Sequence, residues 1–70
     1  MAIEVEVQRL QIGDVVMIGL PDQPRQVEAK VVRGIDRTDT AVRVRLRVQG
    51  REDFVKEWEI DELVTLVRGP

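Results

Sequence analysis

The stretch A-V-R-V-R-L-R-V-Q, from Ala41 to Gln49, decides the fold expected of this chain. Its apolar residues alternate with Arg43, Arg45 and Arg47, and a period of two places successive side chains on opposite faces of a β-strand. We therefore expect one face of this strand to enter a hydrophobic core while the arginine face meets water.

Shorter segments on both sides of this strand are alternating or apolar, and Gly, Pro and Asp residues separate them. In one of these segments the Val31-Val32 pair breaks the period and Gly34 follows, which predicts a β-bulge or a sharp bend. The expected strands are residues 3–7, 15–18, 27–35, 41–49, 54–60 and 64–67, with one helical turn at residues 60–63.

The number and spacing of these segments predict the architecture. Seventy residues form one domain, residues 1–70, because a chain of this length has material for a single small core. A β-sandwich needs more chain, so we expect an all-β small barrel of five to six short antiparallel strands.

The order of the expected elements resembles the SH3-like small β-barrel superfamily. A Gly-Asp turn opens the barrel (Ile12-Gly13-Asp14-Val15-Val16), and a long loop, a bent strand, a hairpin, a single helical turn (Asp61-Glu62-Leu63) and a closing strand follow. That superfamily includes KOW and Tudor-type modules, photosystem I E-type accessory subunits and the variable chain of ferredoxin–thioredoxin reductase. The resemblance implies a fold and does not single out one family.

Charge is segregated along the chain, although the formal net charge is only −2. Residues 25–51 hold eight basic side chains against three acidic ones, whereas residues 52–70 hold six acidic against two basic. Such a pattern indicates either a face that binds an anion or two segments that pair with each other.

Cross-strand pairing favours a structural role for the three arginines of residues 41–49. Glu57 and Glu59 are expected on their side of the sheet, because residues that pair directly in an antiparallel ladder share a face. A three-residue loop would place Arg45 opposite Glu57 and Arg43 opposite Glu59. A five-residue loop would place Arg47 opposite Glu57 and Arg45 opposite Glu59. Either register puts guanidinium opposite carboxylate, which leaves less charge for a phosphate.

Four other arginines have no obvious partner in the sequence, and they are the candidate residues for binding a partner or a phosphate. Two lie in expected loops, one in a turn and one beside the expected bulge. Solvation of the surface is the alternative role for these charges. The four are Arg25, Arg33, Arg37 and Arg51.

The two aromatic residues, Phe54 and Trp58, are expected in the core. A methyl-lysine cage, a groove for proline-rich peptides or a platform for stacking bases needs several exposed rings, so none of these is expected. Lys56 lies between the two aromatics and is expected at the mouth of the barrel, with its stem buried and its amine in water.

Composition argues against catalysis. The chain has no His, Cys, Ser, Tyr or Asn, and its only side-chain hydroxyls are Thr38, Thr40 and Thr65. The usual nucleophiles, the general base of neutral pH and the preferred zinc and copper ligands are therefore missing. We expect no enzymatic activity, no catalytic residue, no cofactor and no bound metal.

The N-terminal sequence M-A-I-E-V-E-V lacks the basic start and long apolar run of a signal peptide, and no segment has the length of a membrane span. A cytoplasmic protein that does not associate with membranes is expected.

The favoured function is that of a non-catalytic protein-interaction or accessory module. It would dock on a protein partner or on a second copy of itself, for example through an exposed edge at Ile3, Val5 and Val7. The alternative is sequence-independent binding of RNA or DNA phosphates by the four candidate arginines.

Overall fold

The computed structural model describes residues 2–70 and contains one antiparallel sheet. Outside a single short 3₁₀ helix, these residues form no helix, so the expected all-β class is confirmed. The elements are β1 (Ile3–Glu6), η1 (Val7–Arg9), β2 (Val15–Ile18), β3 (Val27–Arg37), β4 (Ala41–Arg47), β5 (Phe54–Glu59) and β6 (Leu63–Arg68).

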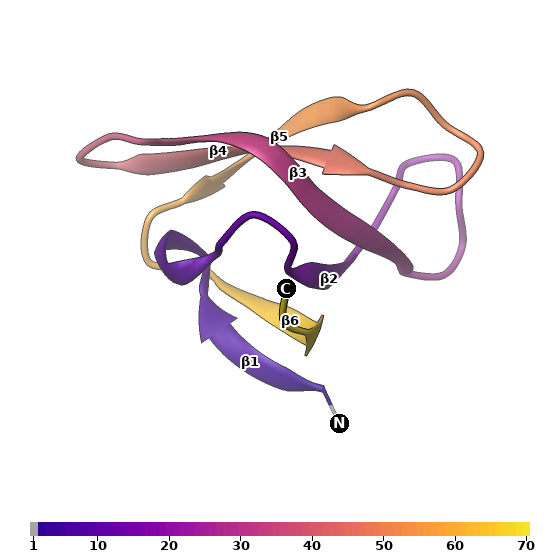
Figure 1. Ribbon diagram of the computed structural model, residues 1–70, viewed down its shortest axis with the longest axis horizontal. Coiled ribbons are helices and arrows are strands. Elements are labelled where there is room, and N and C mark those ends of the chain that lie inside the picture. Colours follow the sequence, from indigo (N-terminus) through magenta and orange to yellow (C-terminus); the bar gives the residue numbers. More distant parts are fainter. Residues whose placement is uncertain (1) are drawn as a thin grey trace.

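The sheet folds over on itself, because its strand order is β1-β6-β2-β3-β4-β5 and the long β3 bends between two layers. Figure 1 shows β3, β4 and β5 above and β1, β2 and β6 below. The apolar faces of the two layers meet in one core. Its most deeply buried large side chains are Val7, Leu10, Val16, Val31, Val42, Val44 and Leu46.

The inner face of β4 is buried as its alternation predicts. Val42, Val44 and Leu46 are fully shielded from solvent, and the intervening arginines are exposed or half-buried. Burying each such side chain stabilises the fold by roughly 1.5–3 kcal/mol, so this strand anchors the sheet.

The bulge expected in β3 is confirmed, and the ladder to β4 is interrupted twice. Val31 pairs with Leu46 and Arg33 with Arg45, so two steps along β3 match one step along β4. A second register shift lies between Arg33 and Asp36. An extra residue in one strand bends the pair and increases its twist, which lets β3 pass from one layer to the other.

The Gly-Asp turn before β2 requires its glycine. Gly13 has φ +99°, and a Cβ atom there would lie 2.7 Å from the Cβ of Pro70. The next residue, Asp14, is buried and accepts a hydrogen bond from the Gln11 N–H at 2.8 Å. Its backbone N–H also donates to the Gln11 carbonyl, so this carboxylate has a structural role at the start of β2.

Two details at the strand ends differ from the expectations. Val7 lies in η1 rather than in the first strand, where its buried N–H donates to the Glu62 carbonyl at 2.9 Å. The turn at residues 60–63 is a single hydrogen-bonded turn, closed by the Glu62 N–H on the Glu59 carbonyl at 3.0 Å. It does not extend into a helix because β6 begins at Leu63.

Candidate functional site

The register of the β4–β5 hairpin determines which arginines are neutralised, and it differs from both predicted registers. Arg43 lies opposite Glu57, and Arg45 lies opposite Val55. The cause is a tight turn in which the Arg51 N–H donates to the Val48 carbonyl at 3.1 Å, with Gly50 at φ +82°. This turn starts earlier in the chain than either predicted loop, and the pairing shifts with it.

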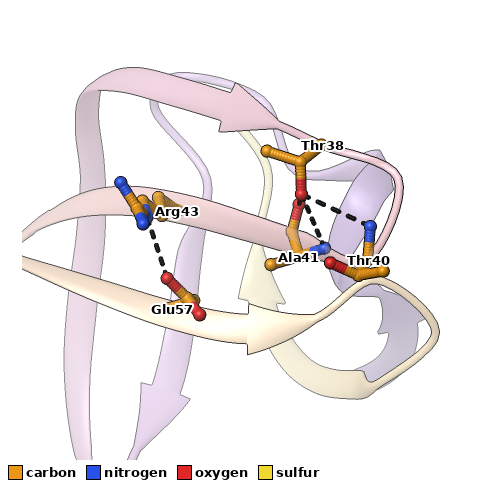
Figure 2. Close-up of polar contacts among 5 residues, drawn as sticks. All are labelled: Thr38, Thr40, Ala41, Arg43 and Glu57. Carbon is orange, nitrogen blue, oxygen red and sulfur yellow. Dashed lines mark hydrogen bonds and ion pairs between the residues drawn. The ribbon is translucent and has the colours of Figure 1, made fainter.

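Two of the three β4 arginines form ion pairs with carboxylates. Arg43 Nε donates to Glu57 Oε1 at 2.8 Å (Figure 2), and this bond raises the pKa of the Arg43 guanidinium. Arg47 donates two hydrogen bonds, both 2.9 Å, to the two oxygens of Asp53. A bidentate pair of this kind fixes the geometry of both side chains.

The middle one of the three β4 arginines has no carboxylate partner. Arg45 makes no hydrogen bond or ion pair with any side chain among residues 2–70, and its neighbour on β3 is Arg33. Both predicted registers placed a glutamate opposite Arg45, and this prediction is wrong because Val55 lies there. Like charges directly opposite each other destabilise a sheet, so this row carries an electrostatic cost that the row of Arg43 and Glu57 avoids.

The pKa of the Asp53 carboxyl is affected by the arginines around it. The hydrogen bond from Arg47 is the main cause that lowers the pKa of its carboxyl, and the charges of Arg45 and Arg33 lower this pKa further. Three guanidiniums therefore act on one carboxylate. Lys30, which is exposed, lies opposite Arg47 in the ladder and adds a fourth cation.

We call Lys30, Arg33, Arg45 and Arg47 the basic face. It spans β3 and β4, two strands of the upper layer in Figure 1, and its side chains are exposed except for that of Arg45, which is half-buried. Within the described part of the chain, Asp53 is the one carboxylate that is hydrogen-bonded to it.

The four candidate arginines predicted from the sequence do not form one site. Arg37 donates to the carbonyls of Gln8 and Leu10 at 2.8 and 3.0 Å, so it ties the end of β3 to η1. Arg51 donates to Asp22 at 2.6 Å and links two loops. The remaining two are exposed, Arg25 in the loop before β3 and Arg33 on the basic face.

The other members of the basic face were not predicted from the sequence. Arg45 and Arg47 were assigned glutamate partners, and Lys30 had been placed on a strand without a site. The signal that could have identified Arg45 is the position of the Gly50 turn, which sets the hairpin register.

A second surface lies at the start of β5, which is an edge strand of the sheet. Val55 is 52% exposed there, beside an open groove of about 580 Å³. We call this the β5 groove. Its lining residues are Gly19, Leu20, Pro21, Arg51, Glu52, Phe54, Val55 and Lys56.

The residues that follow on the inner side of β5 are Lys56 and Trp58, and the prediction that Trp58 lies in the core is confirmed. Trp58 is 9% exposed and belongs to the core. Lys56 is half-buried, with its Nζ 5.3 Å from the centroid of the Trp58 ring. This distance suits a cation–π contact, so the ammonium of Lys56 has a partner.

Residues 2–70 contain no group of three or more His, Cys, Asp or Glu side chains placed to hold a metal ion. Thr38 is occupied in a turn, where its Oγ accepts from the N–H groups of Thr40 and Ala41 (Figure 2). Over the same residues, no helix has the length and apolarity needed to cross a bilayer.

Comparison with known proteins assigns no family. No family model matches this chain, and no curated protein and no solved structure gives a match.

Proposed function

We propose that this protein is a non-catalytic binding module of SH3-like fold that docks an extended segment of a protein partner along β5. The strand order supports the fold proposal. Strands β2 to β5 follow one another as antiparallel neighbours, and β6 returns to pair with β2. That arrangement fits an SH3-like barrel, to which β1 adds a strand beside β6.

The observation that carries the proposed function is the free edge of β5 beside the β5 groove. In the strand order, β5 has a neighbour on one side only, so its other side presents backbone donors and acceptors. A partner strand can add to such an edge through backbone hydrogen bonds, while a pocket beside it selects one side chain.

The two halves of β5 suit this role differently. Its second half carries charge at Glu57 and Glu59, which discourages indiscriminate pairing of the edge with other strands. Its first half is apolar at Phe54 and Val55, and both residues line the groove. Docking is therefore expected at the first half, with an apolar side chain of the partner in the groove.

The opposite edge of the sheet is a weaker candidate. Strand β1 has only four residues, and Val7 has left that edge for η1. Ile3 remains 53% exposed, so pairing of two copies through β1 is the second arrangement. Sedimentation of the wild type and Ile3→Lys distinguishes it, because a β1-mediated dimer would dissociate in the variant.

Selection from a random peptide library on the immobilised protein tests the proposal. Val55→Lys should weaken binding of the selected peptides at least tenfold, because a charged side chain replaces the exposed apolar contact. Leu63→Lys is the matched control, since Leu63 is 58% exposed outside the groove. Peptides that bind both variants equally, or a library that yields none, would contradict docking at β5.

A further inference from the structure

The basic face concentrates positive charge on a small area of sheet. Arg45 and Arg47 are two residues apart on β4, which puts their Cα atoms about 6.6 Å apart along the strand. Each has a cation opposite it on β3, across a spacing of about 4.8 Å: Arg33 faces Arg45, and Lys30 faces Arg47. The four cationic residues therefore form one compact patch on two neighbouring strands.

This concentration is specific to one part of the molecule. Elsewhere on the sheet, Arg43 is paired with Glu57 at 2.8 Å and Arg68 with Glu28 at 3.4 Å, and Arg37 donates to backbone carbonyls. The four cations of the basic face have one carboxylate hydrogen-bonded to them, that of Asp53, and it is bound to Arg47. The charges of Lys30, Arg33 and Arg45 have no ion-pair partner in the described residues, so three cations are available to a ligand.

We infer that the basic face binds the phosphodiester backbone of nucleic acid without reading its bases. A guanidinium presents a planar fork of donors that matches a phosphate group. Duplex DNA carries one negative charge for every ~1.7 Å of its axis, a density that suits clustered cations.

The surroundings of the face favour a phosphate backbone over other parts of a nucleic acid. The face is formed by side chains on the outer side of the sheet, where backbone groups are used in the ladders to neighbouring strands. Phe54 and Trp58, the only aromatic residues of the chain, pack against or within the core, so no ring is free on this face to stack a base. Side-chain charge is the means of recognition, and such contacts carry no sequence information.

This site shares no residue with the β5 groove, although Arg45 lies opposite Val55 in the ladder, and its binding is tested independently of the proposed function. The probe is a fluorescent 20-base-pair DNA duplex, titrated by anisotropy at about 20 mM salt and then over a salt series. Contacts from Lys30, Arg33 and Arg45 should give a slope of log affinity against log salt of about −2.7, at about −0.9 per phosphate contact.

The decisive variant is the double substitution Arg33→Gln and Arg45→Gln. Its slope should fall to about −0.9, and its affinity at about 20 mM salt should fall at least tenfold. The matched control is Arg9→Gln with Arg43→Gln, which removes the same charge from arginines that are already paired with Glu6 and Glu57. The control should stay within threefold of the wild type.

Three results would overturn the inference. They are absence of duplex binding by the wild type at about 20 mM salt, an equal loss in the control, and displacement of the duplex by polyglutamate at the same concentration of charge. The last result would assign the face to an acidic polypeptide. Circular dichroism checks folding, and if the double variant unfolds, Arg33→Gln alone should reduce the steepness of the slope by about 0.9.

The Val55→Lys variant separates the two proposals. It should bind the duplex at least as tightly as the wild type, because it leaves the basic face intact and adds a cation beside Arg45. Loss of peptide binding with retained duplex binding in this variant would place the two ligands on different surfaces.

Discussion

Two neighbouring arginines of the β4–β5 hairpin, Arg43 and Arg45, have different residues opposite them on the adjacent strands. We refer to an arginine and the residues opposite it as a row. In the row of Arg43 and Glu57, a cation and an anion lie opposite each other and are hydrogen-bonded. In the neighbouring row, Arg45 lies between Arg33 on one side and Val55 on the other. The first row stabilises the register of the hairpin. The second leaves the charge of Arg45 without an ion-pair partner among the described residues.

The difference arises from register and not from composition. The three arginines of β4 are spaced identically and face the same way, but they have different partners, and Arg45 is half-buried where the other two are exposed. A shift of two residues in β5 would exchange those partners while keeping every side chain on its present face. Residue type therefore predicts a face, whereas function depends on which residues meet across the strands.

The largest effect is expected beneath these rows, where both depend on one buried layer. Leu46→Ala should lower the free energy of unfolding by about 2–5 kcal/mol, because Leu46 is fully buried and its truncation leaves a cavity. Arg45→Ala, its neighbour on the outer face, should change this free energy by less than about 0.5 kcal/mol. Urea denaturation of both variants measures the contrast, and similar losses would show that the arginine row supports the fold.

An intermediate effect on stability is expected when Arg45 is given a carboxylate opposite it, as Arg43 already has. Arg33→Glu places a carboxylate opposite Arg45, so it should raise the free energy of unfolding by about 0.2–1 kcal/mol. The same variant should lose duplex binding. A variant that is destabilised, measured by thermal unfolding at low salt, would show that Arg33 and Arg45 do not face each other as their register implies.

The smallest effect distinguishes the arginines near Asp53. Arg47→Gln should raise the pKa of the Asp53 carboxyl most, because the hydrogen bond from Arg47 is its main cause of lowering. Arg45→Gln should raise this pKa less, because Arg45 acts only through its charge. Carbon-13 NMR titration of the carboxyl measures both shifts, and the reverse order would contradict the bidentate geometry.

The direction in which folding stability changes with pH follows from the pKa of the same carboxyl. The pKa of Asp53 is lower in the folded chain than its ordinary value of 3.8, so its contribution is present above that value. The contribution is lost as the pH falls below 3.8 and through the folded pKa. The difference in melting temperature between wild type and Asp53→Asn should therefore shrink over that interval.

The sequence predicts the faces of the strands and some of their irregularities. Alternation alone placed Val42, Val44 and Leu46 inside, and the Val31-Val32 pair correctly indicated a bulge. These features are local, because each depends on residues adjacent in the chain.

The partners of the arginines could not be predicted in the same way. Arg37 binds backbone carbonyls 27 and 29 positions away, and Arg51 binds Asp22 across two loops. Arg45 needed the position of the turn at Gly50, where a different start of the turn changes every cross-strand pair. Contacts between distant segments depend on the complete fold.

The two interruptions in the β3–β4 ladder lie on either side of Arg33. A strand segment bounded in this way is held by fewer regular cross-strand bonds than its neighbours, so it can adjust its backbone at low cost. In the proposed complex, Arg33 is therefore the cation whose backbone can adjust most easily to the position of a phosphate, and its amide should exchange with solvent deuterium sooner than those of β4.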